Sequence, residues 1–260
     1  MDFEGKTVLI TGSGSGIGKS AANRFANGGA NLVLADINKR SLEETCEEIR
    51  ASGRNVISVE LDVGNLDEID LMVEKAMSEF NGIDVLFNNA GLTRHISFLD
   101  IEEQHWDQIH RVNSKGAFFC MQKTARTMVN RGRGGRIVNT ASIAGRGYRR
   151  TSNAAYAASK GAVIAMTYIA SSVLAPHNIN VNAVCPGIVQ TNMLSNILTG
   201  RSDDLGSTSN ELRDAMIEEI PIGRVNEADD VSALAVFLAG PGSRNITGQA
   251  FNVDGGMIMS

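Results

Sequence analysis

Aromatic residues, prolines and cysteines are all scarce in this sequence. Of its 260 residues only 5% are aromatic, four are proline and three are cysteine. The cysteines, Cys46, Cys120 and Cys185, lie far apart and form no CxxC pair, which argues against a disulfide framework and against a cysteine-based zinc site. We therefore expect no metal site, and a cytoplasmic protein whose thiols stay reduced.

The sequence also lacks a dense basic run and a long apolar run. Its formal net charge is −5, so nothing in it attracts a polyanion such as nucleic acid. The most apolar stretch, Ala162 to Ala175, is too short to span a bilayer and contains two serines. The opening residues, Met-Asp-Phe-Glu, do not have the pattern of a signal peptide. We expect neither a nucleic-acid partner nor a membrane.

Hydrophobic residues make up 43% of the chain, which is enough for the core of one large domain. Short β-branched or leucine-rich runs alternate with longer stretches of helical period. This alternation predicts an α/β fold: a single doubly wound domain over residues 1–260, with a seven-stranded parallel sheet flanked by helices. The predicted strands are Thr7–Ile10, Leu32–Ala35, Val56–Val59, Val85–Phe87, Ile137–Asn139, Ile179–Val184 and Ala250–Val253.

One segment, residues 190–219, departs from this alternation. It has a middle rich in serine, aspartate and asparagine, punctuated by Gly200 and Gly206, between two helical patches. Such a polar, glycine-punctuated stretch predicts a mobile insertion over the edge of the sheet, beside the substrate.

A glycine cluster follows the first predicted strand directly. Glycines there permit a tight turn, and the next helix offers free N–H groups and a positive dipole end to a pyrophosphate. A Walker loop would need glycine where Ser13 stands, and the common GxGxxG spacing, counted from Gly12 and Gly14, reaches Ile17 instead. The pattern that remains, TGxxxGxG, is carried by Thr11, Gly12, Gly16 and Gly18.

Asp36 ends the second predicted strand, about 20 residues beyond the glycine loop. A carboxylate at this place accepts hydrogen bonds from an adenosine ribose and repels a 2′-phosphate. Ile37 follows it, and Ser15 rather than a basic residue stands in the loop, so NAD is favoured over NADP. Lys39 and Arg40 could bind a phosphate, but their position predicts exposed side chains at the start of a helix.

Tyr156 and Lys160 lie four residues apart in a segment of helical period, so their side chains share one face. A tyrosine titrates near ~10, and acid–base work near neutrality needs a shift of roughly 3 units. A nearby ammonium group supplies a lowering of about that size. Ser142, just past the fifth predicted strand, could hold a substrate oxygen from the other side.

Asn113 falls on the mainly apolar face of a predicted helix that also carries Trp106, Ile109 and Cys120. A buried amide needs hydrogen-bond partners. It could satisfy backbone groups in the core or take part in a proton relay, and the helix by itself does not decide between these roles.

Together these motifs resemble those of the short-chain dehydrogenase/reductase family, whose members are single Rossmann-type domains and commonly homotetramers. The resemblance covers essentially the whole chain. It includes two further motifs, NNAG at Asn88–Gly91 and PGIVQT at Pro186–Thr191. The residues that match the catalytic tetrad of the family are Asn113, Ser142, Tyr156 and Lys160. It implies NAD as cofactor. The cofactor-binding residues that it implies are Gly12, Ser15, Gly16, Ile17, Gly18, Asp36, Ile37, Asp62, Val63, Asn89, Ala90, Gly91, Tyr156, Lys160, Pro186, Gly187, Ile188, Val189 and Thr191.

The family mechanism implies hydride transfer between NAD(H) and a secondary alcohol or ketone, with Tyr156 as general acid and base. Lys160 would hold the nicotinamide ribose and lower the pKa of Tyr156, and Asn113 would support a water that relays protons. We expect a small polar substrate of the polyol, hydroxy-ketone or hydroxy-acid type. A P-loop phosphohydrolase and a catalytically silent dinucleotide sensor remain as alternatives, although Ser13 disfavours the first.

Two predicted loops beside the reacting oxygen carry cations. Arg94 and His95 follow the NNAG segment, while three arginines lie between Ser142 and Tyr156. Guanidinium groups suit carboxylates and phosphates, so one of them could bind an anionic group of the substrate, with Arg149 as first choice. The alternative is that these arginines point to solvent or to a neighbouring subunit. The candidate substrate contacts are Arg94, Tyr148 and Arg149.

Overall fold

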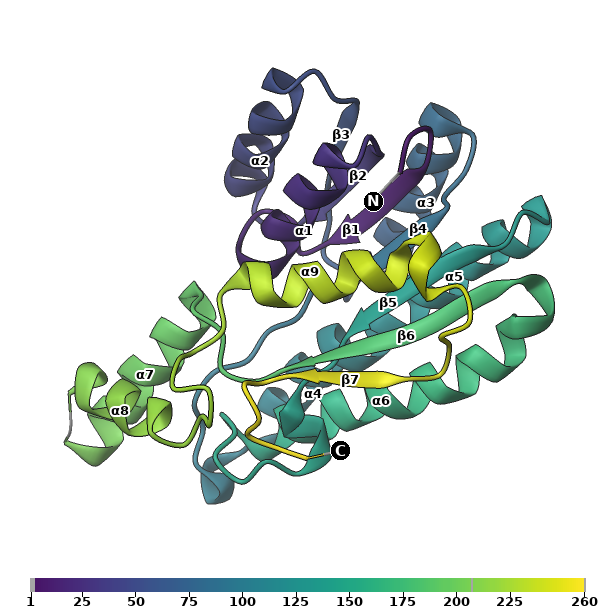
Figure 1. Ribbon diagram of the computed structural model, residues 1–260. Helices are drawn as coiled ribbons and strands as arrows, with labels where there is room; N and C mark the ends of the chain where they lie inside the picture. Colours follow the sequence, from purple (N-terminus) through teal and green to yellow (C-terminus); the bar gives the residue numbers. More distant parts are fainter. Residues whose placement is uncertain (1–2, 207, 260) are drawn as a thin grey trace.

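One parallel sheet of seven strands, in the order β3-β2-β1-β4-β5-β6-β7, forms the middle layer of the computed structural model (Figure 1). Residues 3–206 and 208–259 are described, apart from the side chains of 203–205. Residues 1, 2, 207 and 260 of the predicted domain therefore lie outside the description. The strands are β1 (Thr7–Thr11), β2 (Asn31–Asp36), β3 (Val56–Glu60), β4 (Val85–Asn88), β5 (Gly135–Thr140), β6 (Ile179–Pro186) and β7 (Ala250–Val253). All seven predicted strands and the doubly wound parallel sheet are confirmed.

Helices cover both faces of the sheet, because its central strands are apolar on both sides. In β1, Val8 and Ile10 join the hydrophobic core under α1, α2 and α9, whereas Leu9 joins the core under α3, α5 and α6. Figure 1 shows these two groups of helices on opposite sides of the strands. The main helices are α1 (Gly16–Asn27), α2 (Lys39–Ala51), α3 (Leu66–Phe80), α4 (Glu103–His110), α5 (Ala117–Arg131), α6 (Ala154–Leu174) and α9 (Ala228–Ala239).

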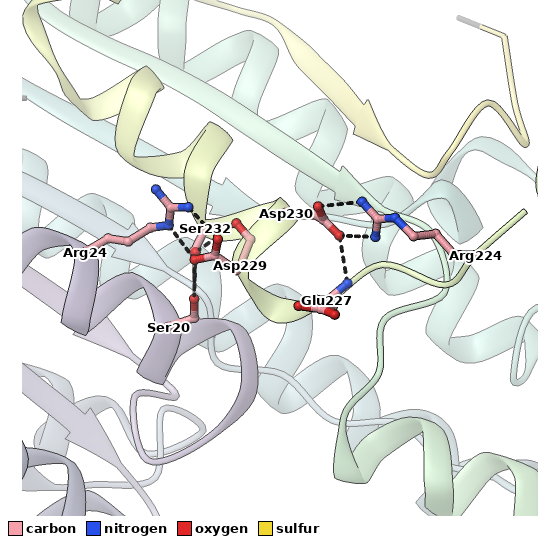
Figure 2. Close-up of polar contacts among 7 residues, drawn as sticks. All are labelled: Ser20, Arg24, Arg224, Glu227, Asp229, Asp230 and Ser232. Carbon is pink, nitrogen blue, oxygen red and sulfur yellow. Dashed lines mark hydrogen bonds and ion pairs between the residues drawn. The ribbon is translucent and has the colours of Figure 1, made fainter. Parts of the chain in front are cut away.

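The start of α9 is fastened to α1 by an ion pair. Arg24 of α1 donates to both carboxylate oxygens of Asp229 at 2.6 and 2.5 Å, and Ser20 donates to the same carboxylate at 3.4 Å (Figure 2). Arg224, on the segment that leads into α9, donates to Asp230 at 2.6 and 2.9 Å. Because α1 begins in the glycine loop, this contact fixes the helix behind that loop.

Residues 190–219 form two helices, α7 (Asn192–Leu205) and α8 (Ser209–Ile217), which replace the predicted loose insertion with regular structure. They pack on each other through a small apolar cluster that contains Leu194, Leu198 and Met216. Figure 1 shows the pair beyond one end of the sheet, outside both helix layers. Whether the pair moves over bound substrate stays a prediction.

The helical segment Ala154–His177, which extends α6, is long and apolar enough to cross a membrane by length and composition, with a hydropathy of 1.3. This helical segment is longer than Ala162 to Ala175, the most apolar stretch of the sequence. Val163 and Ile164 pack against Ala183 of β6, while Tyr168, Ile169 and Val173 are exposed. A core helix of a soluble protein has the same composition, so this segment gives no independent sign of a membrane.

Candidate active site

A cavity of about 420 Å³ lies at the carboxyl ends of the strands, where ligands bind in doubly wound sheets. Residues that end or directly follow six of the seven strands meet there: Gly12, Asp36, Leu61, Asn89, Ala141 and Gly187. All the predicted cofactor-binding residues line this cavity except Gly18.

Gly18 packs beneath the loop instead of facing the cavity. A Cβ at Gly18 would lie 2.0 Å from the carbonyl oxygen of Gly12, so a larger residue would push the loop apart. Gly12 itself has φ +66°, and a Cβ there would lie 2.9 Å from Cα of Ala90. Glycine at both positions lets the loop sit directly against the segment after β4.

Asp36 is at one end of the cavity, fixed by two backbone N–H groups. Its Oδ2 accepts from Gly14 N and its Oδ1 from Asn38 N, both at 2.9 Å. Lys39 pairs with Glu60 at 3.5 Å and Arg40 with Glu44 at 2.9 Å, and neither lines the cavity. The prediction that these two cations are surface residues at the start of α2 is therefore confirmed.

The NNAG segment is bound to the glycine loop through Asn89 and Thr11. The Asn89 amide donates to the carbonyl oxygens of Thr11 and Gly12 at 3.2 and 3.1 Å. In return, Thr11 Oγ1 accepts from the N–H groups of Asn89 and Ala90, both at 3.0 Å. These bonds align the floor of the cavity between β1 and β4. Asp62 lies further along the cavity, where its carboxylate accepts from Arg111 at 2.8 Å.

Tyr156, Ser142 and Lys160 line the same cavity. Asn153 caps α6 by accepting from Tyr156 N at 2.7 Å, which places Tyr156 in the first turn of the helix and Lys160 one turn later. Ser142 Oγ accepts from Ala144 N at 3.1 Å. The ammonium of Lys160 donates to the carbonyl oxygen of Thr140 at 2.7 Å and lies 5.9 Å from the centroid of the Tyr156 ring. The three side chains therefore lie together in one cavity, with the ammonium group near the phenol ring.

Burial is the largest influence on the pKa values of Tyr156 and Lys160. It raises the pKa of Tyr156 above its ordinary value, and a hydrogen bond from Ser142 opposes that rise. Burial also lowers the pKa of Lys160 to about 8, because the charged form loses its hydration. In this structure the net shift of the Tyr156 pKa is therefore upward, and the lowering by Lys160 that the family mechanism implies stays a prediction.

Asn113 lies in a π-helical turn, η2 (Arg111–Gly116), between α4 and α5. It is fully buried and does not line the cavity. Its amide bonds Leu92 of the segment after β4 and Ser159 of α6. The side chain therefore satisfies backbone groups in the core, which is one of its two predicted roles, and the role in a proton relay stays a prediction. The π turn provides the extra residue that directs this side chain inward.

The substrate end of the cavity differs from the prediction. Tyr148 lines it, but Arg94 and Arg149 are exposed and do not. The arginines that do line it are Arg150, the neighbour of the predicted Arg149, and Arg201 of α7, which the sequence analysis did not consider. Arg201 could have been found from the sequence, because it lies within residues 190–219, the segment predicted to lie beside the substrate. Apolar residues from α7 and α8 complete this end: Met193, Leu194, Ile197 and Met216.

Ser13, the residue that breaks the Walker pattern, is buried under the loop. Its hydroxyl donates to the carbonyl oxygen of Ala35 at 3.2 Å. The loop is therefore held against β2.

Comparisons with known proteins agree with this geometry. A family model described as enoyl-(acyl carrier protein) reductase matches residues 12–258. The chain is 37% identical over 259 residues to the 3-oxoacyl-[acyl-carrier-protein] reductase of Thermotoga maritima, with 100% of both chains covered. It is also 37% identical over 260 residues to the sorbitol dehydrogenase of Cereibacter sphaeroides, again with 100% of both covered. Among solved structures it is similar to NAD⁺-bound xylitol dehydrogenase, with a TM-score of 0.91, 32% identity, and 98% of this chain and 100% of that chain covered.

The matched region contains the glycine loop, the Ser142, Tyr156 and Lys160 group, and the segment after β6, and these relatives extend over the full length of the chain. The alternative of a P-loop phosphohydrolase is thereby overturned. The chain belongs to the short-chain dehydrogenase/reductase family of oxidoreductases.

Proposed function

We propose that this protein is an NAD(H)-dependent enzyme that transfers hydride between the cofactor and a small polar secondary alcohol or its ketone. One observation carries the proposal: Tyr156, Ser142 and Lys160 share a single cavity with Asp36 and the glycine loop. A proton-transferring phenol is thus placed beside a cleft of the kind that binds a dinucleotide.

The residues of the cleft fit such a cofactor. Gly12, Ser15 and Gly16 line the cavity, and α1 begins in the same loop, where its free N–H groups can meet a pyrophosphate. The Asp36 carboxylate at the far end suits the ribose hydroxyls of NAD and repels the 2′-phosphate of NADP. Lys39 and Arg40, which could attract that phosphate, are paired with glutamates at the surface. NAD⁺ in the similar xylitol dehydrogenase supports the same choice.

When bound, NAD accepts or donates the hydride. In alcohol oxidation, Tyr156 as phenolate removes the hydroxyl proton while hydride leaves the carbinol carbon; in ketone reduction, neutral Tyr156 protonates the alkoxide oxygen. Ser142 orients that oxygen with its hydroxyl. Lys160 would hold the nicotinamide ribose, and its positive charge favours the phenolate form of Tyr156. Asn113 maintains the segment after β4 beside these groups.

The substrate class rests on the relatives and on the cavity wall. The chain is as similar to a sorbitol dehydrogenase as to a 3-oxoacyl-[acyl-carrier-protein] reductase. Polar side chains of Ser142, Tyr148, Ser152 and Tyr156 line the substrate end and can bind the hydroxyls of a small substrate.

Turnover of a substrate panel tests the proposal. Polyols, hydroxy acids, hydroxy ketones and a 3-oxoacyl thioester are offered with NAD⁺ or NADH, and NADH fluorescence is followed over time. We expect turnover of at least one small polar compound and a preference for NAD(H). Tight NADH binding without turnover of any compound would favour the dinucleotide sensor, and a preference for the thioester would overturn the small-substrate class.

We also propose that the protein forms a homotetramer. Large apolar side chains remain exposed on both helix layers, and a tetramer with two kinds of interface can cover both. The exposed residues are Trp106 of α4, Phe118 of α5 and Tyr168, Ile169 and Val173 of α6 in one layer, and Phe237 of α9 in the other. Light scattering on the purified protein should give four times the mass of one chain, and a monomer at micromolar concentration would contradict the proposal.

A further inference from the structure

Two guanidinium groups, those of Arg150 and Arg201, line the cavity that also contains Ser142 and Tyr156. We propose that they form a binding site for an anionic group of the substrate, a carboxylate or a phosphate ester, with Arg201 as the main contact. This inference rests on the proposed function, because it places the anion on the same molecule as the reacting hydroxyl.

Arg201 is a half-buried cation, and most of its donors have no partner within the part of the chain that the structure describes. One terminal nitrogen donates to the carbonyl oxygens of Arg150 and Thr151, both at 3.3 Å. No carboxylate lies within ion-pair distance of Arg201 among the side chains that the structure describes. Burial and the nearby charge of Arg150 both lower the pKa of Arg201, so its charge is held at a cost. An oxyanion would relieve that cost and use the remaining donors of the guanidinium fork.

Arg150 is paired, but the pair does not neutralise the site. Its guanidinium contacts the carboxylate of Glu219, which also accepts from the hydroxyl of Tyr148 at 3.2 Å. Glu219 pairs with Arg150 and not with Arg201, so the formal charge of the cluster of Arg150, Arg201 and Glu219 is positive. A positive cluster on the wall of a partly enclosed cavity attracts an anionic ligand.

The cluster is built from three segments that are held in place. The hydrogen bonds of Arg201 fasten α7 to the loop between Ser142 and Tyr156. Glu219 follows α8, and the chain beyond it is anchored where Arg224 donates to both oxygens of Asp230 (Figure 2). A substrate anion would thus meet a prearranged wall, which reduces the ordering cost of binding.

The loop between Ser142 and Tyr156 connects the anion site to the reacting oxygen. Ser142 precedes this loop, Tyr156 follows it, and Tyr148 and Arg150 lie in its middle. All four residues line one cavity of about 420 Å³. One small substrate can therefore place its hydroxyl at Tyr156 and its anionic group at the arginines.

Matched substrate pairs separate charge from size. 3-Hydroxybutanoate and 4-hydroxypentanoate are compared with their own amides, and sorbitol 6-phosphate with sorbitol, using the ratio of kcat/KM within each pair. The carboxylate and phosphate arms show which oxyanion the site prefers. For at least one pair we expect the wild type to favour the anion, and Arg201→Met to lower the ratio by roughly 10- to 100-fold through KM. Arg201→Lys should restore part of the preference.

Arg149→Met is the matched control, because Arg149 adjoins Arg150 in the sequence and is exposed like it, but does not line the cavity. It removes the same charge and should change the ratio by less than about fivefold. A larger effect of Arg149→Met than of Arg201→Met would overturn the assignment. So would a wild type that uses each neutral compound as well as its anionic partner.

A binding measurement that needs no turnover tests the anion site independently of the proposed function. Malonate and inorganic phosphate are titrated into the protein with NADH present, by calorimetry. Arg201→Met should raise the Kd of whichever anion binds more tightly by roughly 10-fold or more. Glu219→Gln, which removes the carboxylate paired with Arg150, should lower the Kd of the same anion. If NADH binds and neither anion is bound, the anion site is wrong even when a neutral alcohol turns over. If the anion binds as predicted but nothing turns over, the proposed function fails and the anion site stands.

Discussion

The side-chain amide of Asn113 satisfies both backbone polar groups of Leu92. Its Nδ2 donates to the Leu92 carbonyl oxygen and its Oδ1 accepts from Leu92 N, each at 2.8 Å, and Nδ2 also donates to Ser159 Oγ at 3.1 Å. One buried residue of the π turn thus joins the segment after β4 to α6, the helix that carries Tyr156.

Replacing Asn113 should lower the free energy of unfolding. Asn113→Leu keeps the approximate volume but leaves the N–H and carbonyl groups of Leu92 without their partner. Each lost partner costs about 1–3 kcal/mol, so the free energy of unfolding should fall by roughly 2–5 kcal/mol in urea titrations. The control is Asn196→Leu on the exposed side of α7, where we expect a change of about 0.5 kcal/mol or less. Equal stabilities of the two variants would show that the paired bonds to Leu92 contribute little.

Tyr156→Phe tests the proton donor. The phenol is the group proposed to exchange a proton with the reacting oxygen, so its loss should lower kcat by about 10²–10⁴-fold. NADH affinity, measured by fluorescence, should be retained because the ring is still packed. Tyr168→Phe removes a hydroxyl from the exposed side of the same helix and should leave kcat unchanged. Near-normal turnover by Tyr156→Phe would require another acid and base.

The fold was predictable because its signals are local. Each predicted strand lies within an observed one, and the shifts are at most two residues at either end, since buried parallel strands are short apolar runs with clear boundaries. The cofactor end of the cavity was predictable for a related reason. Loops at the carboxyl ends of parallel strands converge, so Gly12, Asp36 and Asn89 were expected at one edge once a parallel sheet was predicted.

The features of the site that the sequence did not predict depend on long-range packing. Arg201 reaches the cavity because α7 rests on α8 and bonds to the loop before α6, and no local pattern specifies that placement. Arg149 and Arg150 are neighbours in the sequence, yet only Arg150 meets Glu219 from the segment after α8. The upward shift of the Tyr156 pKa could not be predicted, because burial depends on everything packed around the ring, whereas the spacing to Lys160 indicates only a shared helix face.

Cofactor preference should depend on Asp36. In the wild type we expect kcat/KM with NAD⁺ to exceed that with NADP⁺, and Asp36→Ala should narrow the gap mainly by improving NADP⁺ use, since a carboxylate no longer faces the 2′-phosphate. Lys39→Ala is the companion variant: because Lys39 pairs with Glu60, it should leave the ratio of the two cofactors unchanged. A wild type that prefers NADP⁺, or a large loss of NADP⁺ use in Lys39→Ala, would contradict this account of the loop.

The pair of Arg24 and Asp229 should contribute a small, pH-dependent stability. The hydrogen bond from Arg24 lowers the pKa of Asp229, so the pair stabilises the folded state above the ordinary aspartate pKa and its contribution is lost as pH falls through the lower, folded value. Because the Asp229 side chain is 60% exposed and that of Arg24 is 35% exposed, solvent screens the pair, and we expect Asp229→Asn to cost only about 0.5–1 kcal/mol at neutral pH. The difference from wild type should shrink in urea titrations below about pH 4. Asp214→Asn, at an exposed position of α8, should show no such trend.

Lys160 should make stability rise with pH on the alkaline side. Burial lowers its pKa from 10.5 to about 8 in the folded protein, so between these values the unfolded chain binds a proton that the folded protein does not. The charge penalty on the folded state is therefore largest below pH 8 and is relieved as pH rises toward 10.5. At 1.36 kcal/mol per unit, a lowering from 10.5 to about 8 corresponds to roughly 3 kcal/mol.

The difference in unfolding free energy between wild type and Lys160→Met measures this contribution. Tyr156 and the buried cysteines titrate in both proteins, so their effects largely cancel in the difference. Urea titrations at about pH 7.5 and 10 should show the wild type gaining on the variant by roughly 2–3 kcal/mol across that window. Lys75→Met, at an exposed position of α3, should give a difference that does not change with pH. A flat difference for Lys160→Met as well would mean that Lys160 keeps its charge in the folded protein, with the bond to the Thr140 carbonyl compensating fully for its burial.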